Sequence, residues 1–399
     1  MAKRVAIPFK EVKPVVVGAY GAYNAARIQR FDMPVNLPTT DIDELGNRQH
    51  AGTVTDLPEV TVTLQAMDVS AKFFAALVGS SYDTFANSDI NALGDLDVIG
   101  YIKSATIEDI AKSVHIRKAR VSSFTYTYSV DGEATEEYTA EGSDKRWFKY
   151  DVMTDSFDDD GVGPYAITET PIQLKNGDYM ISVIVDGVWF TEVAAGAGDG
   201  EYTYDAGNVT LGEAATDRVT IIYHANPAGT NWSDISDDTI PAAIRGKNIP
   251  VELKANSISR VQSVTIRGTL PITRVEEMGS LEAAGYVTQV PSVEVDITVL
   301  DTDTELIALF ATGEPTPADT EFRACEFTAS GISLDVIIYD PALSCNLPIA
   351  SGTIMKTVYI PALTVTSEGH STNVGGNATQ TFTCRSTDAQ CVVYKGERT

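Results

Sequence analysis

Residues 37–46 read LPTTDIDELG and residues 270–279 read LPITRVEEMG, so five of the ten positions are identical at a shift of 233. At the same shift, residues 52–58 (GTVTDLP) return as residues 285–291 (GYVTQVP). Two matches at one shift indicate that a segment of the chain is duplicated.

The duplication continues toward the C-terminus. LDVI at 96–99 returns at 334–337, and residues 116–144 match 360–388 with nine identities in 29 positions. The shift changes only between segments, as expected when loops gain residues while the elements between them keep their length. The chain therefore contains one domain twice, which predicts a ring or array with twice as many similar units as chains.

Size and charge narrow the class of protein. The 399 residues are enough for two to three domains with separate cores. No apolar run approaches the roughly 20 residues that span a bilayer, and Lys10, Glu11 and Lys13 interrupt the only candidate secretion signal. The formal net charge is −26, and 17 acidic but only two basic residues fall within 151–240. This balance opposes stable binding to phosphate backbones and favours solubility at high local concentration.

Spacing and composition divide the chain into five parts. We expect an N-terminal arm over 1–26, the first copy over 27–152, an insert over 153–240, a linker over 241–257 and the second copy over 258–399. The borders of the insert are acidic and rich in turn-forming residues, as linkers between domains usually are.

Each copy contains a strand followed closely by a short helix. Residues 60–64 and 293–297 alternate polar and apolar side chains, which predicts half-buried strands. The pattern then predicts helices over 68–79 and 302–312.

Candidate caps mark the ends of these helices. Asp68 is the expected N-cap of the first helix, and either Asp301 or Asp303 caps the second. Gly79 and Gly313 are expected to end them.

The expected fold class is mainly β. Each copy has a later hairpin, so we expect a mostly antiparallel sheet or small barrel with one helix laid against it. The insert has short strands with turns every eight to twelve residues, which predicts an Ig-like β-sandwich.

No catalytic or metal-binding pattern emerges from the sequence. The four histidines are scattered, and there is no nucleophile elbow, phosphate loop or paired cysteine motif. We therefore expect no enzyme activity, no cofactor and no metal. All four cysteines lie in the second copy, either as buried thiols or in one or two disulfides: Cys325, Cys345, Cys384 and Cys391.

Four features recur in the same order in both copies. They are an acidic loop (44–46 and 277–279), the alternating strand, the helix that ends at a glycine, and a turn that reads GEAT at 132–135 and GNAT at 376–379. In this order they resemble the tail tube (major tail) proteins of tailed viruses. The insert, with YTY, NVTL and VTIIY, is similar to decoration domains of virion proteins. Most tube proteins carry one such domain, whereas this chain carries two.

The resemblance implies a structural virion protein whose sheets close into an inner β-barrel. Two tube domains per chain then predict a trimeric, pseudo-sixfold ring that stacks into a tube and passes double-stranded DNA. The helices would pack outside the sheet, and the insert would project outward. Partners would be further copies of the chain and the terminator, tape-measure and baseplate or tip proteins of the tail, with assembly in the host cytoplasm and no membrane.

Family resemblance also suggests where the contacts lie. The loops 39–52 and 272–285, together with the N-terminal arm, are expected to stack one ring on the next. The candidate stacking residues are Asp41, Asp43, Glu44, Arg48, Arg274, Glu276 and Glu277. If the lumen is acidic, its charges would come from the long hairpin, with Glu133, Glu137 and Glu141 as candidates.

Two other functions fit the same composition. The chain could be another self-assembling surface or fibre protein, which would share the β-rich, acidic and non-catalytic character. It could also be a carbohydrate-binding adhesin module whose insert presents Trp189 and Trp232 to a glycan.

Overall fold

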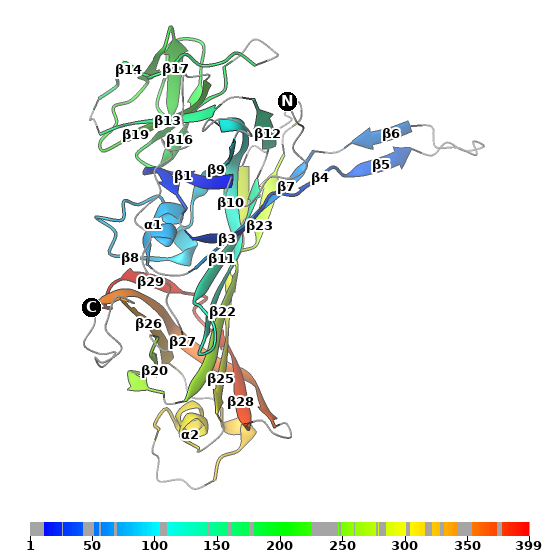
Figure 1. Cartoon of the computed structure of the whole chain (residues 1–399), viewed down its shortest axis with the longest axis vertical. Helices are drawn as coiled ribbons and strands as arrows, with labels where there is room; N and C mark the ends of the chain where they lie inside the picture. The colour runs from blue at the N-terminus through cyan, green and yellow to red at the C-terminus, as the bar shows by residue number, and fades with distance from the viewer. Residues whose placement is uncertain are drawn as a thin grey trace, which may run out of the picture.

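The molecule is elongated and built almost entirely from strands (Figure 1). The computed structural model describes residues 12–25, 27–42, 52–55, 57–67, 70–103, 110–142, 144–149, 151–158, 161–174, 179–225, 246, 249–258, 260–276, 278, 285–300, 304–315, 321–327, 331–340, 353–372 and 377–398. Strands make up 62% of the protein and two α-helices occur in the described part, so the predicted mainly β class is confirmed. The strands form a large antiparallel sheet and a separate seven-stranded one.

The first copy forms one half of the large sheet. Its elements are β1 (Val12–Gly18), β2 (Gly21–Asn24), β3 (Ile28–Asp32), β4 (Val35–Asn36), β5 (Thr39–Ile42), β6 (Gly52–Thr55), β7 (Glu59–Met67), α1 (Lys72–Val78), β8 (Asn87–Asp89), η2 (Ile90–Ala92), β9 (Asp95–Lys103), β10 (Ile110–Ser129), β11 (Thr135–Gly142) and β12 (Asp144–Phe148). The β5–β6 hairpin extends away from the body of the molecule (Figure 1).

The second copy forms the other half. Its elements are β20 (Val251–Leu253), β21 (Asn256–Ser257), β22 (Val261–Thr269), β23 (Ile272–Val275), β24 (Gly285–Thr288), β25 (Ser292–Leu300), α2 (Glu305–Thr312), η5 (Ala324–Glu326), β26 (Ile332–Tyr339), β27 (Ile354–Ser371), β28 (Thr379–Ser386) and β29 (Val392–Lys395). Every strand from β20 to β29 has a counterpart in the first copy.

The two copies pair their strands in the same register. Thr135 lies opposite Met67 between β11 and β7, and Thr379 lies opposite Leu300 between β28 and β25. Both copies also carry an irregularity at matching places, after Val121 in β10 and after Val365 in β27. A bulge is a specific feature that families keep. The repeat seen in the sequence is therefore present in the strand pairing.

The pairing corrects one segment of the sequence match. Val98 lies opposite Ile116, and Leu334 lies opposite Ile360, which is the matching position. Val98 therefore corresponds to Leu334, whereas the LDVI match had placed Leu96 there. A two-residue slip keeps every side chain on its own face of a strand, so the alternating pattern could not reveal it.

The parts expected as arm and linker also belong to the repeat. Val16 in β1 lies opposite Val98, and Leu253 in β20 lies opposite Leu334. Residues 12–24 and 251–257 thus form equivalent first hairpins of the two copies. Their short, irregular apolar runs show no period long enough to reveal a strand in the sequence.

Both helices begin later than predicted. The N-cap of α1 is Ala71 and that of α2 is Thr304, and neither makes a side-chain cap hydrogen bond. The expected caps Asp68, Asp301 and Asp303 lie outside the described residues. Packing of an apolar helix face on the sheet supplies the stability that a cap would otherwise provide.

The predicted ends of the helices are confirmed. Gly79 and Gly313 have φ values of 76° and 77° in the left-handed region, and both backbone N–H groups bond back to the preceding turn. A left-handed residue at this position satisfies a terminal carbonyl, and glycine adopts it without a steric cost.

The insert differs from the expected Ig-like sandwich. Its strands are β13 (Asp151–Phe157), β14 (Tyr165–Ala166), β15 (Ile181–Val185), β16 (Val188–Glu192), β17 (Glu201–Asp205), β18 (Asn208–Leu211) and β19 (Val219–Ala225). They join in the order β13-β19-β15-β16-β17-β18-β14 as one nearly closed, barrel-like sheet with one parallel pair, β16–β17. Short alternating strands have the same sequence pattern in a sandwich and in a small barrel, so the pattern could not distinguish them.

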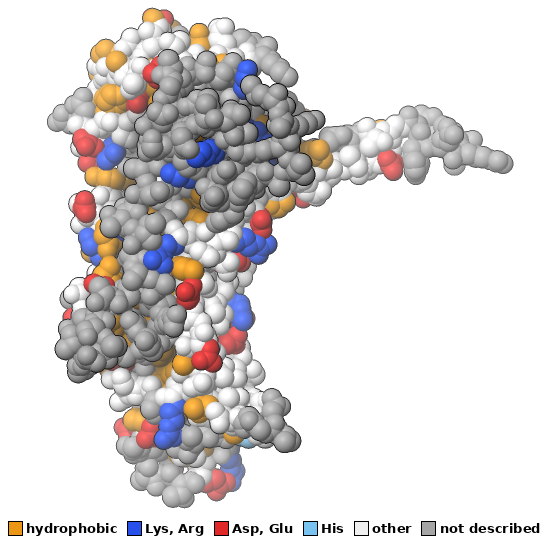
Figure 2. Space-filling view, viewed as in Figure 1, with side chains coloured by type: hydrophobic (Ala, Val, Ile, Leu, Met, Phe, Trp, Pro, Cys, Tyr) orange, Lys and Arg blue, Asp and Glu red, His pale blue; other side chains and the backbone are white. Residues whose placement is uncertain are grey.

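The large sheet has one apolar face and one polar face. Both helices lie on the same side of it (Figure 1), and a single core runs through both copies, including Phe74 of α1, Phe310 of α2 and Leu64 of β7. Threonine and charged side chains alternate with these core residues along the strands and point to the opposite face. Acidic and basic side chains are interspersed along the outline of the molecule on this side (Figure 2).

Candidate assembly surfaces

One strand pair joins the two copies into a continuous sheet. β10 pairs with β22 over seven residue pairs, from Ser123 opposite Thr269 to Ser129 opposite Ser263. A second contact pairs β8 of the first copy with β29 of the second. The chain thus contains a complete example of how one copy attaches to another.

Side-chain sizes at this junction are matched. Phe124 of β10 lies opposite Gly268 of β22, and a Cβ atom on Gly268 would stand only 1.8 Å from the Phe124 ring. On the buried face, Tyr126 of β10 likewise lies opposite the smaller Ile266 of β22. Close packing of this kind tolerates little change in volume.

A buried ion pair crosses the same junction. Lys356 of β27 is fully buried, and its Nζ lies 3.1 Å from Oε2 of Glu136 in β11. The Tyr138 hydroxyl donates to the same carboxylate oxygen at 3.1 Å, and the ammonium lies 4.6 Å from the centre of the Tyr126 ring. Buried charges are tolerated only with such partners, so the two copies are held in one relative position.

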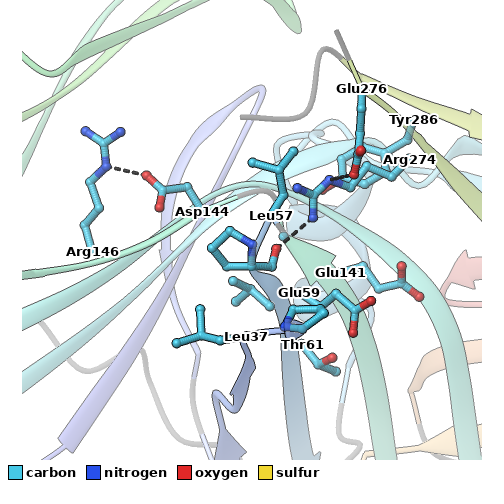
Figure 3. A pocket seen from close by; sticks show the side chains of 14 residues that line it. Leu37, Leu57, Glu59, Thr61, Glu141, Asp144, Arg146, Arg274, Glu276 and Tyr286 are labelled. Carbon is cyan, nitrogen blue, oxygen red and sulfur yellow. Dashed lines mark hydrogen bonds and ion pairs between the residues drawn. The ribbon is translucent and has the colours of Figure 1, made fainter. Parts of the chain in front are cut away.

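The β23–β24 hairpin folds back onto the first copy (Figure 3). Nη1 of Arg274 donates to the carbonyl of Pro58 at 2.7 Å, and its Nε lies 3.4 Å from Glu276. Tyr286 beside it has its pKa raised to about 12, chiefly by burial, with Glu141 adding to the shift and Arg274 opposing it. The hairpin and the first copy enclose a groove lined mainly by Leu37, Leu57, Glu59, Thr61, Asp144 and Arg146.

The continuous sheet that runs through β7, β11, β10, β22, β25 and β28 ends in two strand edges that have no strand partner in the described part of the chain. β3 and β4 pair only with β7, and the end of β27 pairs only with β28. Residues 366–372 are exposed, whereas the matching residues 122–128 of β10 are covered by β22. The two edges are the counterparts of β22 and β10, the edges that meet inside the chain.

A lysine covers part of the β3–β4 edge. Nζ of Lys145 donates to the carbonyl of Met33 and lies 5.2 Å from the centre of the Trp147 ring. Burial, together with the charge of Lys112, lowers the pKa of Lys145. Edge lysines protect open strands from random pairing, so this edge is blocked rather than closed.

Two of the three predicted lumen residues lie on the polar face of the sheet. Glu137 and Glu141 alternate with buried residues of β11, while Glu133 is exposed just before that strand. Arg30 lies 2.5 Å from Asp32 and 3.9 Å from Glu137. Arginines on this face are therefore partly neutralised by neighbouring acids.

The predicted stacking residues fall in different places. Asp41 is exposed on the extended β5–β6 hairpin, where its carboxylate accepts from Oγ1 of Thr53 at 3.1 Å. Arg274 and Glu276 instead contribute to the contact between the two copies. Four candidates lie outside the described residues: Asp43, Glu44, Arg48 and Glu277.

A histidine pair that sequence reasoning missed attaches the insert to the first copy. His115 Nδ1 lies 3.1 Å from His224 Nε2, and His115 Nε2 lies 2.6 Å from Asp97 Oδ2. All three are buried, and Phe148 stacks on His224. The two histidines are 109 positions apart in the sequence, and no local pattern predicts their contact.

The described residues hold no cluster suited to a metal ion, and their cysteines are not paired. Among the described residues, no three His, Cys, Asp or Glu side chains are placed to hold a metal ion. Cys384 and Cys391 are buried thiols, Cys325 is an exposed one, and Cys345 lies outside the described residues. Trp189 is partly buried, and Trp232 is not described. Within the described ranges, no helix is long and apolar enough to cross a bilayer.

Comparison with known proteins adds no family. No protein-family model matches the chain, and no curated protein matches its sequence.

Proposed function

We propose that this protein is a structural subunit that assembles into the tail tube of a tailed virus. The observation that carries the proposal is the β10–β22 junction, together with the two open edges that are its counterparts. Head-to-tail contacts between unlike edges generate closed rings or helical filaments. The chain presents one edge of each kind, so each copy of the chain can join two neighbours.

A ring of three chains would contain six similar sheets. Each copy contributes four strands to the continuous sheet (β3–β4, β7, β11 and β10 in the first), which gives 24 in the ring. At a strand spacing of about 4.8 Å and a tilt of about 40°, such a barrel is roughly 45–50 Å across at the backbone. That leaves room for a DNA duplex after side chains are added.

The polar face of the sheet suits a DNA conduit. Both helices cover the other face, so closure with the helices outside would turn the threonine-rich face to the lumen. Arg267 pairs with Asp296, and Arg30 with Asp32, so these two cations of the polar face are partly neutralised by neighbouring acids. Weak phosphate contacts favour transit over binding.

The remaining expectations become part of this proposal. The insert would project from the tube wall, and the tube would contact terminator, tape-measure and baseplate or tip proteins in the virion. Assembly would occur in the host cytoplasm, without enzyme activity or cofactor. A fibre, surface-layer or glycan-binding role is the alternative, but no specific feature of the two open edges favours it.

Negative-stain microscopy of the purified protein, followed by cryo-microscopy of any assembly, tests the proposal. We expect hollow filaments whose rings contain three chains with pseudo-sixfold symmetry. Flat lattices, solid fibres, monomers that never assemble or rings of six separate chains would each overturn it.

A further inference from the structure

We propose that neighbouring chains join by pairing the β3–β4 edge of one chain with the end of β27 of the next, in the register of the internal junction. Charge contacts secure the joint, from Lys112 and Lys145 to Glu368 and from Asp41 to Arg385. The proposal rests on the proposed self-assembly and names the surface and the partner, a second copy of this chain.

The internal junction supplies the register. Positions in β10 correspond to positions 244 later in β27, and positions in β22 correspond to positions 233 earlier in β3 and β4. Transferring the internal residue pairs in this way places Glu368 opposite Val35, His370 opposite Met33 and Thr372 opposite Phe31.

Between chains, the larger side chains lie on the opposite strand from the one that carries them at the internal junction. Inside the chain, Phe124 on the β10 side meets Gly268 on the β22 side. Between chains, smaller or polar residues of β27 would meet the larger Val35, Met33 and Phe31. Val35 could not meet Phe124, since even the Cβ of alanine would overlap the ring there. The β3–β4 edge therefore fits the end of β27 and rejects β10.

The backbone of the open edge is compatible with this register. The backbone N–H of Leu270 donates to the carbonyl of Ser122. Every second residue of β22 counted from Leu270 therefore has its backbone groups directed at β10. Their counterparts in the open edge include Phe31, Met33 and Val35, which all carry an N–H group. Pro34 falls at a position whose nitrogen faces β7, so its missing N–H costs no bond between chains.

The first charge contact lies between chains at the place that the buried Lys356–Glu136 pair occupies at the internal junction. The counterpart of Lys356 is Lys112, and the counterpart of Glu136 is Gln380, whose amide donates to Glu368 at 2.8 Å. Lys112 and Lys145 lie close enough to interact unfavourably within one chain. A carboxylate from the next chain would offset that repulsion and draw Lys145 away from the Met33 carbonyl.

The second contact uses the counterparts of two charged residues that line the groove at the internal junction. Arg274 and Glu141 line this groove beside Tyr286, and their counterparts are Asp41 and Arg385. Arg385 is exposed and has no hydrogen bond or ion pair within the described residues. If the β5–β6 hairpin of one chain packs on its neighbour as β23–β24 packs on the first copy, it brings Asp41 to Arg385 of that neighbour.

Trp147 marks the same surface independently. Its counterpart in β29 is Val393, which is fully buried against β8 of the first copy. Trp147 itself is 56% exposed, which is unusual for a side chain of this size. The proposed joint would cover it with the second copy of the next chain.

A crosslink tests the register directly. Ser367 would lie opposite Asn36 at a non-hydrogen-bonded pair, where strands approach closely enough for a disulfide. In a Cys325→Ser, Cys345→Ser background, Ser367→Cys with Asn36→Cys should give covalent dimers and trimers on non-reducing gels. The matched control, Ser367→Cys with Pro34→Cys, should give at least tenfold less.

Charge reversal tests the contacts. Glu368→Lys should abolish filaments while the soluble chain keeps its circular dichroism, and Lys112→Glu with Lys145→Glu in the same chain should restore them. Arg385→Asp with Asp41→Arg is the second such pair. Filaments that form without the 36–367 crosslink, or reversals that never rescue each other, would overturn this interface but leave the tube intact. If the parent chain forms no filaments and the Asn36→Cys, Ser367→Cys variant forms no crosslinks, both proposals are overturned.

Discussion

Lys356 Nζ and Glu136 Oε2 lie 3.1 Å apart, although 220 positions separate the two residues in the chain. Both side chains are buried, and they come from different copies of the repeated domain. The pair therefore reports on the relative position of the two copies rather than on the folding of either one.

Removing one member of this pair should destabilise the chain more than removing both. Lys356→Met leaves Glu136 buried without its cation, which costs about 3–5 kcal/mol of unfolding free energy. Glu136→Leu combined with Lys356→Met should recover a large part of that loss. Urea unfolding of all three variants checks the order, and a double variant weaker than both singles would contradict it.

The glycine opposite Phe124 should resist substitution. Gly268→Ala places a methyl group inside the ring contact, and overpacking of this kind costs about 1–3 kcal/mol. Gly285→Ala is the matched control, because a Cβ there meets nothing within 4 Å. Thermal unfolding compares the two, and equal melting temperatures would show that the junction is looser than its geometry indicates.

The stability of the folded chain should decrease as the pH is lowered, because of His224. Burial, reinforced by His115, Arg117 and Arg146, lowers the pKa of His224 to about 2 from its usual 6.5. The unfolded chain therefore binds the extra proton between these values, so stability present above pH 6.5 is lost as the pH falls below it. One such group contributes about 2 kcal/mol between pH 7 and pH 5.

His224→Gln removes this titration. Its unfolding free energy should depend less on pH over the same interval, whereas His370→Gln on an exposed strand serves as the control. Denaturant unfolding at pH 7, 6 and 5 gives the slopes, and unchanged slopes in His224→Gln would assign the acid sensitivity elsewhere.

The sequence revealed those parts of the fold that repeat locally. The match between 37–46 and 270–279, the alternating strands and the helix-ending Gly79 and Gly313 all depend on short-range pattern, and the structure contains them. The register error at Leu334 arose because a two-residue slip preserves alternation.

Contacts between distant segments left no such signal. In the sequence, Glu136 is indistinguishable from the other polar residues of its strand, and no neighbouring residue predicts its ion pair with Lys356. Likewise, Asp97 gave no hint of its bond to His115. These residues are recognisable only when strand order is known, because their partners come from other parts of the sheet.

The two C-terminal glycines of the helices offer a comparison between the copies. Gly313→Ala should cost about 1–2 kcal/mol, the usual penalty for a left-handed residue with a Cβ, since only the flexible Lys254 ammonium lies near. Gly79→Ala should cost more, because its Cβ would stand 2.6 Å from that of Ala19. Thermal unfolding ranks them, and the reverse order would mean that the backbone near Ala19 moves easily.

Acids on the polar face should affect DNA passage but not assembly. Glu137→Gln with Glu141→Gln removes negative charge from the face opposite the helices, so phosphate groups should linger and ejection should slow, on the order of twofold. Asp199→Asn, on the exposed surface of the insert, is the matched control. DNA release from particles built with each variant measures the rate, and microscopy shows whether tubes form. Loss of tubes in the double variant would place these glutamates at a contact between chains, and an unchanged rate with intact tubes would show that this face does not meet the DNA.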